Sequence, residues 1–359
     1  MSQGNNGTQQ NTGPVMELRG LNKHFDPNAN ITETIRGKLF GKEQSKVRAV
    51  DGVDLTLESD QVQGIIGESG CGKSTLLSTL MGLYTPTSGE LRLDGRPVSR
   101  FDKADWKEYR RRVQMIFQDP FNAMNPKFSV REVLREPLEI HDVEYTEETL
   151  LDVLEQVQLN PPENYLDRRE SQLSGGEKQR VSIAKALVLE PDVILADEPV
   201  SMLDVSTQAA ILRLLGDLVD EYGVSMFYVS HDLSTVSYIC DRVNVMYLGR
   251  VVESAPTRKL LDEPKHPYTQ ALINAIPIPD PSHNREPTDL KGTPGDPSDL
   301  PEGCRFKDRC PERMDICDQD PVFASYDDDA HQVACHLYYN HEQGAPAAVT
   351  TEPEVMFDG

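Results

Sequence analysis

A glycine-rich run with a single lysine has the spacing that suits phosphate chemistry. Residues Gly67 to Ser74 are Gly-Glu-Ser-Gly-Cys-Gly-Lys-Ser, and they follow the apolar stretch Gln61 to Ile66. Glycines let successive backbone N–H groups turn inward around phosphate oxygens, and a helix beginning there adds a favourable dipole. In this pattern Lys73 bridges the β- and γ-phosphates of a nucleotide and Ser74 ligates Mg²⁺. The alternative, a glycine-rich turn that only caps a helix, is disfavoured by the strand–loop–helix context.

Two acidic residues end a second apolar strand. Val193 to Ala196 is followed by Asp197 and Glu198. The carboxyl ends of parallel strands are where doubly wound sheets bind ligands. We therefore expect Asp197 to hold Mg²⁺ and Glu198 to orient and polarise an attacking water. Acids often follow strands merely as helix caps, so Asp197 and Glu198 indicate a nucleotide site only in combination with the phosphate loop.

Three further segments carry polar groups suited to the same site. Gln118 and His231 each follow a short apolar stretch, and Leu173 to Glu177, with the sequence Leu-Ser-Gly-Gly-Glu, opens a helix. The N–H groups at such a helix start can bind an anion. Taken alone, that segment fits an ordinary serine N-cap equally well, and a lone histidine after a strand is more often structural.

The hydrophobic pattern predicts the elements that must position these residues. Short apolar or alternating stretches indicate strands, and 3.6-residue periods indicate helices. The expected strands are 15–25, 47–57, 61–66, 113–117, 193–196 and 226–229, and the expected helices lie at 73–83, 130–159 (in two pieces, interrupted at 141–146), 175–189 and around 211–219. Strands that alternate with helices predict an α/β fold with a mostly parallel sheet covered on both faces.

Composition changes along the chain predict its domain organisation. A Gly-, Asn- and Gln-rich start indicates a disordered tail, and Pro, Gly and Asp dominate the segment after Pro277. The expected parts are a tail at 1–14, a main α/β domain at 15–276 with a helical subdomain at about 119–173 and a polar insertion at 26–46, a linker and Cys-rich domain at 277–340, and a tail at 341–359.

Composition and charge exclude several classes of protein. The 359 residues contain no apolar run long enough to span a bilayer, and the start lacks the features of a signal peptide, so we expect a cytoplasmic protein. The net charge of −23 repels nucleic acid. Acidic residues spread along the whole chain favour a protein that works in high salt, such as that of a halophile, over a mildly acidic protein with acidic tails.

The order of these motifs resembles the ABC ATPases over about residues 15 to 250. The resemblance implies an active ATPase whose site forms when two subunits meet head to tail. It implies that Ser174 and Gly176 contact the γ-phosphate held by the other subunit, and that Asp204 lines the dimer seam. Gln118 would sense Mg²⁺, His231 would grip the γ-phosphate, and Phe25 stands where these proteins often stack an aromatic ring on adenine.

The expected site residues follow from the motifs and this resemblance together. The catalytic set is Lys73, Gln118, Glu198 and His231, and the Mg²⁺ set is Ser74, Gln118 and Asp197. The nucleotide-binding set is Phe25, Gly67, Ser69, Gly70, Cys71, Gly72, Lys73, Ser74, Thr75, Gln118, Ser174, Gly175, Gly176, Glu177, Asp204 and His231. Glu177 and Met202 differ from the commoner Gln and Ala, but neither change removes a catalytic group.

Two functional classes of ABC protein fit these motifs. One is the transporter subunits, and the other is the soluble machines for DNA repair, chromosome condensation or translation. The soluble repair class needs a long coiled coil between the two halves of the domain, and only 55 residues separate Gln118 from Ser174. The translation class usually has two cassettes, whereas this chain has one phosphate loop. A transport role is therefore favoured.

Several segments resemble the oligopeptide/dipeptide importer ATPases, extending the resemblance to about residue 340. They are 117–126, 197–201, 247–253, 266–272, 303–311 and 334–336. This resemblance implies a peripheral subunit on the cytoplasmic face of the membrane, with a paralogous second ATPase, two transmembrane permease subunits and an extracellular solute-binding protein as partners. Related importers carry nickel or oligosaccharides, and the ATPase sequence does not identify the solute.

Four late cysteines suggest a metal centre. Cys304, Cys310, Cys317 and Cys335 are separated by five, six and seventeen residues in a segment that can bury little core. Zinc sites usually pair cysteines two to four residues apart, whereas clusters tolerate wider gaps. The subfamily resemblance also points to a [4Fe–4S] cluster, so we rank the cluster first, zinc second and unliganded or disulfide-bonded cysteines third. His331 and His336 could substitute as ligands, although packing roles are favoured for both.

Overall fold

The computed structural model describes residues 13–26, 46–119, 124–275, 292, 295–326, 330–340 and 345–346. Most of the predicted insertion at 26–46, most of the linker after residue 277 and most of both predicted tails lie outside these ranges. The predicted domain boundaries stay predictions.

A mixed sheet forms the centre of the described chain. Its strand order is β11-β12-β10-β9-β3-β8-β7-β6. The five strands from β9 to β6 run parallel, and every residue of β3 and β8 is buried, as expected for strands covered on both faces. The predicted α/β fold with a mostly parallel sheet is confirmed. The strands are β3 (Val62–Ile66), β6 (Val113–Ile116), β7 (Val193–Asp197), β8 (Ser225–Val229), β9 (Arg242–Tyr247), β10 (Arg250–Pro256), β11 (Ala324–Ser325) and β12 (Gln332–Val333).

A separate antiparallel sheet lies beside it, which the sequence pattern did not predict. Its order is β2-β1-β4-β5, and β1 pairs with β2 from Phe25 opposite Val47 to Met16 opposite Leu57. Alternate residues along β2 are buried, so one face of this sheet packs on the core. The strands are β1 (Met16–Phe25), β2 (Val47–Leu57), β4 (Ser88–Leu93) and β5 (Arg96–Pro97).

Helices cover the central sheet. The helix after the phosphate loop, α2, ends at Leu80 rather than at the predicted Leu83, because Gly82 takes a positive φ that does not continue a helix. Glycine is needed at this position because a Cβ would lie 2.6 Å from the Trp106 ring. The larger helices are α2 (Lys73–Leu80), α3 (Lys103–Arg112), α7 (Gly175–Leu187), α8 (Val205–Tyr222), α9 (Leu233–Ile239), α10 (Thr257–Asp262) and α11 (Pro267–Asn274).

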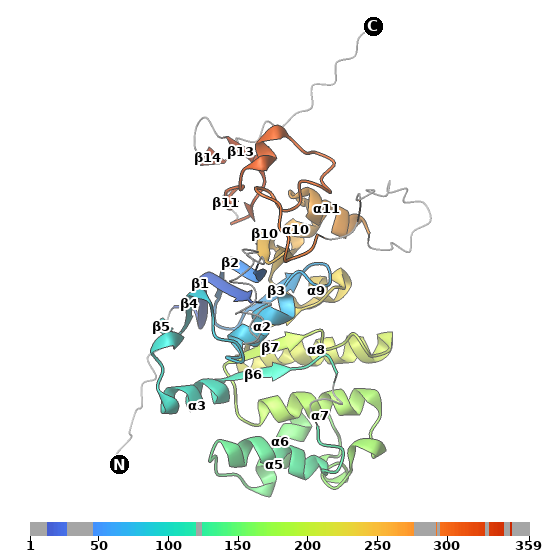
Figure 1. Cartoon of the computed structure of the whole chain (residues 1–359). Helices are drawn as coiled ribbons and strands as arrows, with labels where there is room; N and C mark the ends of the chain where they lie inside the picture. Colours follow the sequence, from blue (N-terminus) through green and yellow to red (C-terminus); the bar gives the residue numbers. More distant parts are fainter. Residues whose placement is uncertain are drawn as a thin grey trace, which may run out of the picture.

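Two helices form a layer beyond α7 (Figure 1). They are α5 (Val130–Ile140) and α6 (Glu147–Gln156), which match the predicted two-piece helical region. Each begins with a capping box, Ser129 with Glu132 and Thr146 with Thr149, which satisfies backbone N–H groups at the helix start. Their apolar faces join the same core cluster as α7 and α8.

The Cys-rich segment packs at the end of the molecule opposite α5 and α6 (Figure 1). Its strand β12 pairs with β10, and β11 pairs with β12, so the segment extends the central sheet. Phe306 is buried against Tyr247 of β9 and Tyr268 of α11. The segment is therefore joined to the central sheet and to α11 by both sheet pairing and aromatic packing. Its further elements are short 3-10 turns at Asp315–Asp318 and His336–Tyr338, and the pair β13 (Tyr339–Asn340) and β14 (Ala345–Pro346).

None of the helices in the described part of the chain has the length and apolar character needed to cross a membrane.

Candidate active site

The phosphate loop connects β3 to α2 as predicted. Gly72 precedes the helix with φ of 110°, and a Cβ there would lie 2.0 Å from the carbonyl oxygen of Ala49, so only glycine fits. The ammonium group of Lys73 donates to the carbonyl oxygens of Gly67 (2.6 Å) and Glu68 (3.1 Å). The Lys73 side chain therefore folds back against the backbone of the phosphate loop.

The other predicted polar residues meet at one edge of the parallel sheet. Gln118 Nε2 donates to Glu198 Oε2 at 3.1 Å, and His231 Nδ1 lies 3.0 Å from Glu198 Oε1. Glu198 itself has φ of 45°, an uncommon conformation for a residue with a side chain, and its N–H donates to Val229 O at 2.9 Å. The carboxylate is held from both sides, an arrangement suited to orienting a water molecule.

Asp197, the last residue of β7, is hydrogen-bonded to the Ser74 side chain. Burial raises the pKa of this carboxyl, and the neighbouring Glu198 charge adds to the effect. A hydroxyl and a carboxylate are oxygen ligands of the kind that Mg²⁺ prefers. The donor set of Ser74 and Asp197 therefore fits the predicted cation.

A cavity of about 700 Å³ unites most of the predicted residues. It runs from the aromatic ring of Phe25 along the phosphate loop to His231. Its lining is Phe25, Val47, Ala49, Ser69, Gly70, Gly72, Lys73, Ser74, Thr75, Gln118, Glu198, His231 and Pro297. Sequence reasoning missed Val47, Ala49 and Pro297, which carry no motif and reach the cavity only through the fold of β2 and the C-terminal segment.

Comparison with known proteins settles the family. The ABC transporter family matches residues 50–201, and the family described as the oligopeptide/dipeptide transporter C-terminal region matches residues 252–317. An oligopeptide transport ATP-binding protein of Bacillus subtilis is 41% identical and covers 92% of this chain and 99% of its own. The chain belongs to the ABC transporter ATPases. A putative peptide import ATP-binding protein of Brucella ovis is also 41% identical, covering 85% of this chain and 92% of that protein.

Solved structures agree with this family. The dimer of an ATP-binding cassette in a post-hydrolysis state, bound to ADP and Pi, has a TM-score of 0.57 and 27% identity, covering 68% of this chain and 99% of that one. CbiO1 of Clostridium perfringens, part of an ABC transporter complex, has a TM-score of 0.58 and 26% identity, covering 70% and 92%. The predicted family is confirmed, whereas the halophile interpretation finds no support in these relatives and stays a prediction.

The Leu-Ser-Gly-Gly segment of this ABC ATPase is not part of the cavity lining. Ser174 N-caps α7, and its N–H donates to Glu177 Oε2 at 2.7 Å, which forms a capping box. Gly176 faces Thr207 of α8, whose start is capped by Asp204. The chain therefore places its Ser-Gly-Gly segment and Asp204 next to each other and outside its own nucleotide cavity.

Two predicted residues support the cavity from behind. Cys71 is buried, and burial raises the pKa of its thiol. Gly67 has no room for a side chain, because a Cβ would lie 2.2 Å from the carbonyl oxygen of Met246. Both residues shape the loop without lining the cavity.

The four late cysteines of this ABC ATPase lie near one another. Burial and the neighbouring thiols Cys304, Cys310 and Cys317 raise the pKa of Cys335 to about 12. In the part of the chain that the structure describes, however, no three His, Cys, Asp or Glu side chains are gathered closely enough to hold a metal ion. His331 instead pairs with Glu253 at 2.7 Å, and His336 Nε2 lies 3.0 Å from the carbonyl oxygen of Gln319.

Proposed function

We propose that this ABC ATPase powers the import of oligopeptides or dipeptides. The observation that carries the proposal is the match of residues 252–317 to the C-terminal region of oligopeptide/dipeptide transporters, within a chain 41% identical to an oligopeptide transport subunit over nearly its full length. ATP hydrolysis follows from the family itself. Membrane permeases and a solute-binding protein are its expected partners.

A soluble, non-transport machine is the first alternative. The repair class of such machines would need a long coiled coil inside the domain, whereas the only α-helices among the described residues between β6 and α7 are the short α5 and α6. The translation class usually has two cassettes, and this chain has one phosphate loop. An importer of nickel or oligosaccharides is the second alternative. Such an importer would have the same ATPase site, so only the solute that stimulates turnover distinguishes it from a peptide importer.

The proposed mechanism assigns one task to each polar side chain of the cavity. Lys73 binds the β- and γ-phosphates, Glu198 orients and polarises the attacking water, and His231 contacts the γ-phosphate. The contacts of Gln118 and His231 with the two Glu198 oxygens support this assignment, because they fix the carboxylate toward the cavity. Ser74, Asp197 and Gln118 would hold Mg²⁺, which supplies neutralising charge at the phosphates.

The proposed site is completed by a second subunit. Ser174, Gly175, Gly176, Glu177 and Asp204 would act on the nucleotide held by the partner, a role supported by their position outside this chain's own cavity. We propose a paralogous ATPase as that partner. The likeness of residues 117–126 to peptide importers supports docking of the 119–126 region to a permease, which would give the chain a peripheral place at the cytoplasmic face; residues 120–123 lie outside the described residues.

The Cys-rich segment is proposed to hold an iron–sulfur cluster. The proposal is supported by the spacing of the four cysteines along the sequence, because zinc sites usually pair cysteines two to four residues apart, whereas a cluster whose cysteines bind separate irons tolerates wider gaps. Protein purified without oxygen should be brown with about four irons per chain. One zinc and no colour would overturn the cluster, and no metal would overturn the site.

The transport proposal is tested by reconstituting the chain with its permeases in liposomes. Turnover of ATP should rise when the cognate solute-binding protein carries a dipeptide or oligopeptide. A Lys73→Ala chain in the same liposomes is the control for contaminating ATPases. Stimulation by nickel or an oligosaccharide alone would replace the proposed solute, and hydrolysis indifferent to permeases and binding protein would contradict the transport role.

A further inference from the structure

An ion pair joins the Cys-rich segment to the phosphate loop. Arg309 Nη1 donates to Glu68 Oε2 at 2.7 Å, and Arg309 Nη2 donates to Glu68 Oε1 at 2.9 Å. Both arms of the planar guanidinium are used, which makes this pair directional as well as strong. Glu68 is the second residue of the phosphate loop, and 241 positions separate it from Arg309.

The arginine side of the pair is anchored in the protein core. The Arg309 side chain is only 8% exposed, and its guanidinium lies 5.8 Å from the ring centres of both Tyr247 and Phe306. The Glu68 carboxylate, first among several causes, raises the pKa of Arg309, which therefore stays charged. Because Tyr247 ends β9 and Phe306 is fully buried, the guanidinium has a fixed position relative to the central sheet.

The glutamate side of the pair reaches the backbone that surrounds the phosphates. The N–H of Glu68 donates to Tyr268 Oη at 2.8 Å, and its carbonyl oxygen accepts from Lys73 Nζ at 3.1 Å. Movement of Glu68 would therefore shift both a loop peptide and a partner of the catalytic lysine. The pair thus contacts the start of the loop from outside the cavity.

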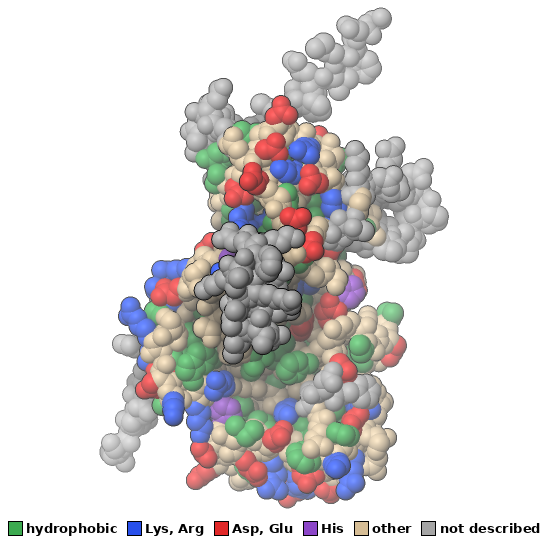
Figure 2. Space-filling model, viewed as in Figure 1, with side chains coloured by type: hydrophobic (Ala, Val, Ile, Leu, Met, Phe, Trp, Pro, Cys, Tyr) green, Lys and Arg blue, Asp and Glu red, His purple; other side chains and the backbone are tan. Residues whose placement is uncertain are grey.

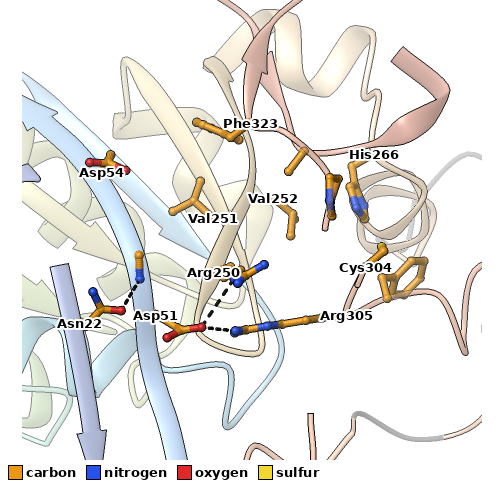
Figure 3. A pocket seen from close by; sticks show the side chains of 14 residues that line it. Asn22, Asp51, Asp54, Arg250, Val251, Val252, His266, Cys304, Arg305 and Phe323 are labelled. Carbon is orange, nitrogen blue, oxygen red and sulfur yellow. Dashed lines mark hydrogen bonds and ion pairs between the residues drawn. The ribbon is translucent and has the colours of Figure 1, made fainter. Parts of the chain in front are cut away.

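The same segment also contacts the other wall of the nucleotide cavity. Arg305, four residues before Arg309, is buried and pairs with Asp51 of β2 (Figure 3). Asp51 Oδ1 in turn lies 2.6 Å from His24 Nε2, next to Phe25 of the cavity lining. A cavity of about 330 Å³ between β2, β10 and the Cys-rich segment lies around this contact (Figure 3). The segment thus touches both the loop and the β1–β2 wall.

We propose that Arg309 is a positioning residue that holds the phosphate loop, through Glu68, in the shape that binds ATP. The Cys-rich segment is then a determinant of ATP affinity, and any change that displaces the loop from Cys304 to Cys310 weakens nucleotide binding. The inference rests on the proposed nucleotide site but adds a role outside it. It concerns binding rather than the chemical step, since neither Arg309 nor Glu68 lines the cavity at Glu198.

The test compares ATP binding by the purified full-length chain and three variants. Arg309→Met should raise the Kd for ATP about tenfold, because a charge-assisted bidentate contact to the loop is lost. Arg309→Lys keeps the charge but loses the bidentate contact, and should raise the Kd for ATP about threefold. Arg313→Met is the matched control, since Arg313 lies in the same segment but pairs with Asp308 and Asp318. Its Kd should equal that of the unaltered chain.

Two further readouts separate positioning from general damage. In the reconstituted complex, kcat at saturating ATP should change less than about twofold for Arg309→Met while the KM for ATP follows the Kd. In a Glu68→Gln background, Arg309→Met should have almost no further effect on the Kd, because the two residues act as one pair.

The inference is overturned if Arg309→Met binds ATP as the unaltered chain does, or if it weakens binding equally in both backgrounds. If Arg309→Met does not fold, Arg309→Lys decides: an unchanged Kd sinks the inference. Failure of the proposed nucleotide site looks different, because then the unaltered chain and Lys73→Ala would bind ATP equally.

Discussion

Asp51 lies where β2 contacts the Cys-rich segment, and several basic side chains surround its carboxylate. It meets Arg305, His24 and, at 3.6 Å, Arg250. Burial acts to raise the pKa of Asp51, but the charge and hydrogen bonds of Arg305 and His24 outweigh it and leave the pKa below its usual value. The carboxylate is thus stabilised in its charged form by partners from three distant parts of the chain.

Removing the buried partner of Asp51 should cost stability. Arg305→Met leaves a buried carboxylate with fewer partners and should lower the free energy of unfolding by about 3 kcal/mol, measured by urea denaturation. The control is Arg250→Met, whose side chain is 33% exposed and should cost less than about 1 kcal/mol. Equal losses in the two variants would show that burial of the pair is not what matters.

The site residues divide clearly by what a motif can reveal. Lys73, Ser74, Asp197 and Glu198 could be predicted because each stands at a fixed place next to an apolar strand. The Arg309–Glu68 pair could not, because its members are 241 residues apart and neither type is unusual at its position. Contacts of that kind depend on the fold of the whole chain.

At the scale of elements, the cap that His266 provides for α11 makes the stability of the fold depend on pH. It caps α11, with Nδ1 accepting from the N–H of Tyr268 at 3.0 Å, and burial lowers its pKa to about 4. The unfolded chain, with a histidine pKa of about 6.5, binds the proton more readily. Stability from this group is therefore complete above about pH 6.5 and is lost as the pH falls toward 4.

His266→Asn should remove this pH dependence, because asparagine caps a helix without titrating. Between pH 7 and pH 5 the unaltered chain should lose about 2 kcal/mol of unfolding free energy through His266, and the variant should lack that part of the slope. The measurement is a series of denaturation curves across this range. Identical slopes would contradict the capping role of a neutral histidine.

The start of α7 offers a second prediction. Ser174→Ala and Ser129→Ala both remove a capping-box serine and should each cost about 1 kcal/mol of stability. Only Ser174→Ala should also lower ATP turnover in the assembled transporter, by more than about tenfold, since we assign Ser174 to the partner's γ-phosphate. ATP binding to the isolated Ser174→Ala chain should be unchanged. Equal turnover in both variants would reduce Ser174 to a helix cap.

Strand prediction from the sequence succeeded for apolar and alternating stretches, including β1 and β2, and missed a core strand that carries a buried polar side chain. The strand at 193–196 was predicted because all its side chains are apolar, and it is β7 of the structure. No strand was predicted at β9, where Asn244 is fully buried and donates to Gln63 Oε1 at 2.7 Å while accepting from Ser254 Oγ at 2.7 Å. A buried polar network hides a core strand from a hydrophobic pattern.

At the scale of the whole molecule, the strong negative charge predicts a dependence on salt. The net charge is −23, and acidic side chains lie on both the C-terminal segment and the helical end of the face in Figure 2, with basic ones among them. If this is an adaptation to high salt, the purified chain should unfold or lose activity in dilute buffer and recover in molar KCl, where the screening length is about 3 Å. Equal stability in both buffers would remove the halophile interpretation.

The central claim is a composite ATP site in which Glu198 directs the attacking water. Its most direct test is to measure ATP binding, turnover and oligomeric state of Glu198→Gln together. We expect unaltered ATP binding, turnover reduced by more than about a hundredfold and an ATP-dependent closed dimer that persists on size exclusion. Turnover at the rate of the unaltered chain, with ATP bound normally, would contradict it.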